Sequence, residues 1–163
     1  MIQTPWAEND ELFRRELEEG HRWASKVGAL LEAEGLQVAV TPMEWRATLA
    51  DADQFASEYD LLVEGQIVDV KSRRLDFTGA HDFPYRTVIV DTVAGWDAKP
   101  VKPVAVIDIS QKTGGVFVVP VSTFPEWRQE PAYDRVRQIR EVNYTVARDL
   151  IRPLEDFVTW LRG

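Results

Sequence analysis

Asp60, Asp69 and Lys71 are residues whose types and spacing suit metal-assisted chemistry. Gly65-Gln66 lies between two short apolar-rich stretches and predicts a two-residue type II′ hairpin turn with glycine first. In that register Asp60 pairs with Lys71, and Asp69 pairs with Leu62. Directly opposed residues share a face of a strand pair, and so do residues two apart on one strand. The three charged side chains are therefore predicted to converge on one face of the hairpin.

The opposite face of this hairpin is predicted to be apolar, with Leu61, Val63, Val68 and Val70 on it. On the charged face, carboxylates are the oxygen ligands that Mg²⁺ prefers, and one or two of them commonly suffice when water and phosphate complete the shell. A metal bound there can stabilise charge on a phosphate and lower the pKa of a bound water. A neighbouring lysine can orient that water or stabilise the developing charge.

A second interpretation of the same residues involves no catalysis. Asp60 and Lys71 can form a cross-strand ion pair on a solvated sheet face, with Asp69 as another surface acid. An Asp-x-Lys tripeptide is too common to decide between the two interpretations. The hairpin context favours catalysis, because an acid lies opposite the lysine between apolar strands and a long helix precedes them.

The elements that must position this patch are predicted from periodicity. Asn9 and Asp10 are typical helix caps, and an apolar stripe at three- and four-residue spacing predicts a helix from there to about Glu34, ended by Gly35. The order of helix, strands and helix predicts one α/β domain over residues 1–163, with a mixed sheet flanked by helices. Strands are predicted over residues 36–40, 60–63, 67–72, 87–91, 104–109 and 116–121, and a last helix over 152–161.

Composition limits the function classes. A hydrophobic content of 45% is enough for a packed core, and a net charge of −8 argues against a domain that coats nucleic acid electrostatically. That charge does not exclude an enzyme that works through a bound cation. The chain has no cysteine, and His21 and His81 lack ligand spacing, so a zinc site is not expected. The first residues carry no leader pattern, which indicates a cytoplasmic protein.

The stretch Tyr59-Asp60, followed after Leu61–Gln66 by Ile67-Val68-Asp69-Val70-Lys71, resembles the PD-(D/E)XK signature of metal-dependent nucleases. Tyr59 replaces the nominal proline, and the motif spans residues 59–71 only. The preceding helix is similar to the first helix of resolvase-like and restriction-endonuclease-like members. The whole chain, particularly residues 83–122, resembles small phage-encoded members.

This resemblance implies a restriction-endonuclease-like fold with an αβββαβ core. It also implies that Asp60, Asp69 and the carbonyl of Val70 ligate Mg²⁺ or Mn²⁺, and that Lys71 is the active-site lysine. Many members carry a glutamate on the inner face of the first helix, where this chain has Ala24. No carboxylate lies on the apolar stripe of that helix, and Glu16, the nearest to the stripe, is well off angle and two turns away. Loss of the glutamate implies weaker or single-metal binding, or an inactive copy.

Further polar residues are candidates for contacts with the substrate. Gln111 follows a predicted strand, where it either touches the phosphate or simply marks the entrance to a turn. Arg73, Arg74, Arg86 and Lys99 lie near the motif, where they either bind DNA phosphates or remain solvated.

Two other stretches leave alternatives open. The loop that contains Phe77, Phe83 and Tyr85 either stacks on bases or covers the core. The basic run over residues 135–140 either faces DNA or forms the polar face of a short helix, and we expect the helix.

Together these residues predict a cytoplasmic deoxyribonuclease that hydrolyses phosphodiester bonds with Mg²⁺ or Mn²⁺, with DNA as its partner and no membrane association. The predicted catalytic residues are Asp60, Asp69, Lys71 and Gln111. A homodimer, or a complex with a phage or host replication protein, is left open. The alternatives are a catalytically weak or inactive nuclease-like DNA-binding module and a phage protein-interaction factor on the same fold.

Overall fold

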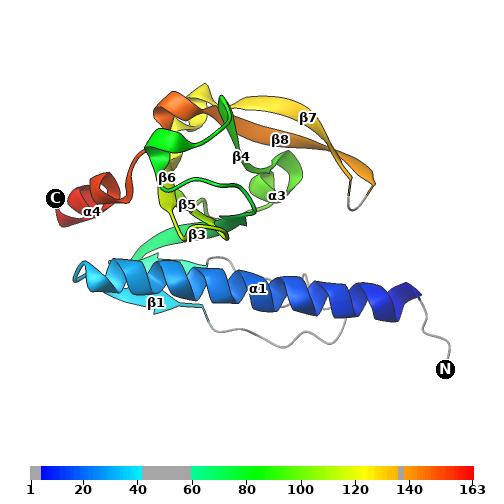
Figure 1. Cartoon of the computed structure of the whole chain (residues 1–163), viewed down its shortest axis with the longest axis horizontal. Coiled ribbons are helices and arrows are strands. Elements are labelled where there is room, and N and C mark those ends of the chain that lie inside the picture. The colour runs from blue at the N-terminus through cyan, green and yellow to red at the C-terminus, as the bar shows by residue number, and fades with distance from the viewer. Residues whose placement is uncertain (1–4, 42–59, 136–137) are drawn as a thin grey trace.

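The computed structural model describes residues 5–41, 60–135 and 138–163. They form an α/β structure in which a long helix covers one face of a mixed five-stranded sheet and a three-stranded sheet covers the other (Figure 1). The predicted class, a mixed sheet flanked by helices, is confirmed. Among the described residues, no helix is both long and apolar enough to cross a membrane.

The elements have the following bounds. In spatial order the first sheet contains β1 (Val38–Val40), β2 (Leu61–Val63), β3 (Gln66–Arg73), β5 (Ala105–Ser110) and β6 (Val116–Pro120). The second sheet contains β4 (Thr87–Thr92), β8 (Ile139–Ala147) and β7 (Arg128–Asp134). The helices are α1 (Pro5–Ala33), α3 (Val93–Asp97) and α4 (Leu154–Arg162), with 3₁₀ turns η2 (Ala80–Asp82), η3 (Val121–Glu126) and η4 (Arg148–Leu150).

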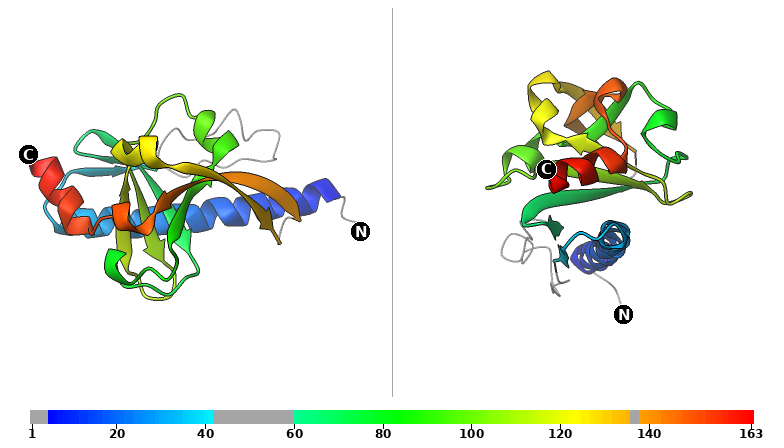
Figure 2. Two further views of the ribbon diagram at one scale, coloured as in Figure 1. Left: turned by 90° about the horizontal axis from the view of Figure 1, so that it is seen from above. Right: turned by 90° about the vertical axis from the view of Figure 1, so that its left-hand side faces the viewer.

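The C-terminal half of α1 packs on the first sheet. Val27 and Leu31 are fully buried there, and a Cβ at Gly28 would lie only 3.2 Å from the side chain of Val40. The helix therefore approaches the strands closely at Gly28. It begins at Pro5, earlier than the predicted caps, and its N-terminal half extends beyond the sheet, away from α4 (Figure 2).

The β2–β3 hairpin turns one residue earlier than predicted. Glu64 and Gly65 have φ values of 49° and 76°, which is the type I′ geometry, so the II′ turn at Gly65-Gln66 is wrong. The side chain of Glu64 accepts a hydrogen bond from the Gln37 amide at 2.8 Å, which helps to hold a non-glycine residue in this conformation. The observed pairs include Leu61 with Val68, so the register differs from the predicted one by two positions. Since side chains alternate with a period of two, every residue keeps its predicted face.

The polar stretch after residue 127 forms strands rather than a short helix. β7 and β8 pair antiparallel from Arg128↔Thr145 to Asp134↔Ile139, and β8 also pairs with β4. Residues 136–137 of the basic run lie outside the described residues, and the prediction of a helix is wrong for the part that follows, because Arg140 lies in β8. The β7–β8 hairpin reaches out from the body of the molecule (Figure 1).

A second apolar cluster fills the space between the two sheets. Phe77 and Phe83 are 1% and 4% exposed and pack against Phe117 of β6, so these two aromatics cover the core. Tyr85, from the same loop, remains 57% exposed. The loop that leads from β3 to β4 is thereby fixed against the sheet, which positions β4 next to the charged face of β3.

Candidate active site

The two faces of β3 differ in chemistry. Val68 and Val70 point toward α1 and belong to its apolar cluster. Asp69 and Lys71 alternate with them and point toward the second sheet; Asp69 is only 5% exposed. Continuing the observed register beyond β2 puts Asp60 opposite Asp69, on the same face. The structure thus brings Asp60, Asp69 and Lys71 together, although Asp60 lies opposite Asp69 and not opposite Lys71 as predicted.

Asp60 is held against the backbone of β3. Its Oδ2 accepts a hydrogen bond from the Val70 amide at 2.8 Å. Burial raises the pKa of Asp60, and the nearby charge of Asp69 raises it further against the opposing effects of the Val70 hydrogen bond, Lys71 and Lys99. Because the N–H and C=O of one strand residue point to the same edge, the Val70 carbonyl also faces the Asp60 side of β3. The neighbourhood of Asp60 therefore favours a cation.

Two further residues complete the charged patch. The Nζ of Lys99 lies 3.1 Å from Oδ2 of Asp69 and 3.8 Å from Oδ2 of Asp91, and the Nζ of Lys71 lies 3.6 Å from Oδ1 of Asp91. Burial alone would lower the pKa of Lys99, but the charge of Asp69, its hydrogen bond and the charge of Asp91 raise it overall. We call Asp60, Asp69, Asp91, Lys71 and Lys99 the acid–lysine cluster.

Asp91 reaches the acid–lysine cluster because β4 is irregular. The pairing of β4 with β8 shifts between Ile89 and Asp91, so that Ile89 pairs with Thr145 and Asp91 pairs with Tyr144. In a regular strand Asp91 would lie opposite Asn143, on the same face as Ile89. The extra residue is a β-bulge, a device that re-aims side chains and is common beside active sites. Asp91 was not predicted as a site residue, because a bulge leaves no mark in the sequence alternation of β4.

The Arg73 side chain forms its interactions within the protein. Its Nε donates to Oδ2 of Asp108 at 2.8 Å, and its guanidinium also donates to the carbonyl of Ile89. Asp108 is fully buried, and burial raises its pKa against the attraction of Arg73 and Lys71. Arg73 thus ties β3 to both β5 and β4, and it is not a freely exposed contact for DNA.

The other predicted substrate residues lie apart from the acid–lysine cluster. The side chain of Gln111 donates a hydrogen bond to Oγ of Ser72 at 2.9 Å. Ser72 follows Lys71 on β3, so its side chain points to the opposite face of the strand. Arg74 and Arg86 are exposed, and neither takes part in the ion pairs of the acid–lysine cluster among the described residues. Ala24 is 3% exposed in the apolar cluster of α1, and Tyr59 lies outside the described residues.

The donor set suits a small metal site. Within the described ranges no three His, Cys, Asp or Glu side chains are grouped to hold a metal ion. Asp60 and Asp69 nevertheless fit Mg²⁺, because this ion is commonly bound by one or two carboxylates together with waters and substrate phosphate. For a cation to reach Asp69, the ammonium group of Lys99 must move away from it.

No protein-family model matches this chain, and no curated protein matches it. The resemblance to the PD-(D/E)XK nucleases therefore depends on the sequence alone.

Proposed function

We propose that this protein is a divalent-metal-dependent nuclease that hydrolyses DNA phosphodiester bonds at the acid–lysine cluster. The observation that carries this is the gathering of Asp60, Asp69 and Lys71 on one half-buried face of β3. Burying charged groups is costly, and such sites are more often functional than chance would give.

The order of elements adds support for a restriction-endonuclease-like core. α1 precedes the antiparallel strands β1, β2 and β3, and β5 then pairs parallel to β3 over Val68↔Ala105 to Arg73↔Ser110. This is the αβββ order followed by a parallel strand that such a core requires. The connection between β3 and β5 differs from the expected single helix, since it contains β4 and the short α3.

Each residue of the acid–lysine cluster has a role in this reaction. Asp60 and Asp69, with the Val70 carbonyl, would hold Mg²⁺ or Mn²⁺, which supplies charge stabilisation at the phosphate and a more acidic water. Lys71 donates hydrogen bonds to the phosphoryl oxygen that gains negative charge as water attacks. Asp91, 3.6 Å from the Lys71 ammonium, fixes the direction of that group. Lys99 balances the charge of Asp69 until the cation enters.

Cleavage assays test this function directly. Supercoiled and linear DNA are incubated with the protein and Mg²⁺, Mn²⁺ or EDTA, and cleavage is expected only with the metals. Asp69→Asn and Lys71→Ala should abolish it. Asp149→Asn and Lys112→Ala, at exposed sites on η4 and in the β5–β6 turn, are the matched controls and should cleave normally. No metal-dependent cleavage by the unaltered protein, or full activity of both site variants, would contradict the assignment.

One observation favours a second candidate, a DNA-binding module without catalysis. Lys99 already neutralises Asp69, and α1 has Ala24 where a further carboxylate would be expected. Such a module would bind DNA with unchanged affinity in EDTA and would cleave it with no divalent ion.

A further inference from the structure

A cavity of about 560 Å³ lies where α4 meets the strands β5 and β6 of the first sheet. Its lining includes Ala105 and Val118, each only 1% exposed, and the buried ring of Phe157 from α4. These three residues belong to the apolar cluster that packs under α1. The cavity therefore opens on the opposite face of the first sheet from the acid–lysine cluster. We call this space the α4 cavity.

The wall of the α4 cavity is rigid and presents an exposed aromatic ring. Pro103 and Pro120 line it, and proline fixes the backbone torsion φ. Trp160 also lines it and is 58% exposed, and its ring stacks on that of Phe157 at a centroid distance of 6.0 Å. A preformed and mostly apolar space of roughly 300–1,000 Å³ with a few polar groups is typical of small-molecule sites. The α4 cavity therefore suits an apolar small molecule.

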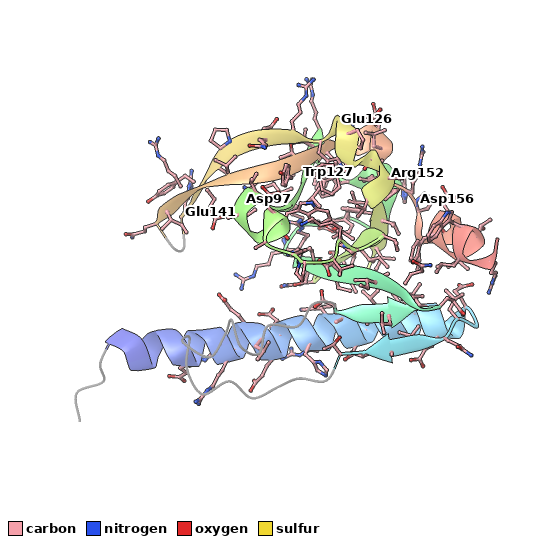
Figure 3. All side chains as sticks on the ribbon, turned by 180° about the vertical axis from the view of Figure 1, so that it is seen from behind. Asp97, Glu126, Trp127, Glu141, Arg152 and Asp156 are labelled. Atoms are coloured by element: carbon pink, nitrogen blue, oxygen red, sulfur yellow. The ribbon has the colours of Figure 1, made fainter. Side chains whose placement is uncertain are left out.

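Two opposite charges in the wall of the α4 cavity have no partner in the protein. Arg152 precedes α4 and Asp156 lies in its first turn, and Figure 3 shows both where the chain enters that helix. The backbone of Arg152 is fixed, because its amide and carbonyl both bond to Val118 of β6 at 2.8 Å. Among the described residues, the side chains of Arg152 and Asp156 form no ion pair or hydrogen bond, either with each other or with another group. A ligand with one negative and one positive group can satisfy both.

The signs of these charges narrow the class of ligand. A simple anion would be attracted by Arg152 but repelled by Asp156, and a simple amine would meet the reverse. A zwitterion offers a carboxylate to the guanidinium fork and an ammonium group to the acid. In an α-amino acid both charged groups and the side chain share one carbon atom. An apolar side chain can then enter the apolar lining while the charged groups stay at the exposed Arg152 and Asp156.

We propose that the α4 cavity binds a free amino acid with a large apolar side chain. Arg152 holds its carboxylate, Asp156 holds its ammonium group, and the rings of Phe157 and Trp160 pack against its side chain. This site shares no residue with the acid–lysine cluster, so it does not depend on the proposed nuclease function.

Isothermal titration calorimetry of the whole chain with L-phenylalanine tests the site. Three analogues each remove one group from this probe: phenylalanine amide lacks the carboxylate, N-acetylphenylalanine lacks the ammonium group, and alanine lacks the ring. L-phenylalanine should bind, and each analogue should bind about tenfold more weakly, as expected for loss of a hydrogen bond between charged groups or of a buried ring.

Variants of the two charged residues should each cancel one of these differences. Arg152→Gln should weaken the binding of phenylalanine about tenfold and leave phenylalanine and its amide with equal affinity. Asp156→Asn should likewise leave phenylalanine and N-acetylphenylalanine with equal affinity. The matched controls are Arg128→Gln and Glu155→Gln, at exposed residues that do not line the α4 cavity, and both should bind like the unaltered protein.

Arg152 and Asp156 are exposed, so their variants are expected to fold, and thermal unfolding checks this. Failure of phenylalanine to bind the unaltered protein at millimolar concentration overturns the proposal. Equal affinity for phenylalanine, its amide and N-acetylphenylalanine also overturns it, because the cavity would then hold the ring alone. Folded variants that keep the full differences between phenylalanine and its analogues would show that the charged groups are recognised elsewhere, which rejects the site as well.

Discussion

The eight residues of β3 form two faces, one apolar and one charged. Toward α1, Val68 and Val70 join an apolar cluster, so that face stabilises the fold by burial. Toward the second sheet, Asp69 and its neighbours place charges where water is largely excluded. Burial raises the pKa of both Asp60 and Asp108, so the ionised forms of these acids oppose folding. One face of β3 therefore stabilises the protein, and the other face is retained at a cost in stability.

Substitutions at adjacent residues on opposite faces of β3 should have opposite effects on stability and activity. Asp69→Asn should reduce cleavage about a thousandfold, near the upper end of the effect of removing a group that stabilises the transition state, with little change in unfolding free energy. Val68→Ala should do the reverse, costing about 2 kcal/mol of stability because it leaves a cavity, while kcat well below the unfolding temperature stays normal. Chemical denaturation and cleavage kinetics measure both. A large stability loss in Asp69→Asn, or a large loss of kcat in Val68→Ala, would contradict the division.

Asp108 lies on the charged side of the first sheet, but its role is structural. Asp108→Ala leaves the Arg73 guanidinium, 23% exposed at its side chain, without its carboxylate. Removing one partner of such a pair typically costs about 3–5 kcal/mol, so a marked drop in the urea midpoint is expected. Arg73→Met in the same background should recover part of the loss, since it removes the unpaired charge. Failure of the second change to recover any stability would show that the pair is not the cause.

Asp60 should show the cost of the charged face as a pH effect. Because burial raises its folded-state pKa above the usual value, its contribution to stability is present below that usual value and is lost as the pH rises through the folded-state pKa. Asp60→Asn mimics the protonated acid and can still accept the Val70 amide hydrogen bond. The variant should therefore unfold at a higher temperature than the unaltered protein at pH 7, and the gain should vanish in acid. Exposed Asp149→Asn should give no such pH-dependent gain.

The smallest effect is expected at Lys99. Its ammonium lies 3.1 Å from Asp69 and competes with any cation for that carboxylate. Lys99→Met should therefore tighten Mn²⁺ binding several-fold, as measured by isothermal titration calorimetry, while Lys112→Met leaves it unchanged. Weaker Mn²⁺ binding in Lys99→Met would mean that Lys99 does not compete with the cation for Asp69.

The periodicity of apolar residues predicted the helices and strands whose burial follows directly from the sequence pattern. Ala24, Val27 and Leu31 on the α1 stripe are buried on one face, and the apolar runs of β5 and β6 are buried on both faces, so the sequence pattern was enough to predict these elements. The shared face of Asp60, Asp69 and Lys71 was predictable even though the turn was misplaced, because a register shift of two positions preserves the faces.

The remaining features arise from tertiary contacts. Glu64 adopts a left-handed turn because Gln37 holds it, and residues 27 positions away leave no local signal. β7 and β8 were missed because the hairpin leaves Tyr133, Ile139 and Val142 exposed, so its apolar residues do not follow one face. Asp91 joins the acid–lysine cluster through a bulge that only the pairing with β8 reveals.

The most direct test of the central claim is a crystal soaked in Mn²⁺ and measured at the manganese absorption edge. We predict one anomalous peak at ligand distance, about 2.1 Å, from carboxylate oxygens of both Asp60 and Asp69, with the Lys99 ammonium displaced from Asp69. No peak at this position in a crystal that binds Mn²⁺ elsewhere, with Lys99 still paired to Asp69, would contradict the account.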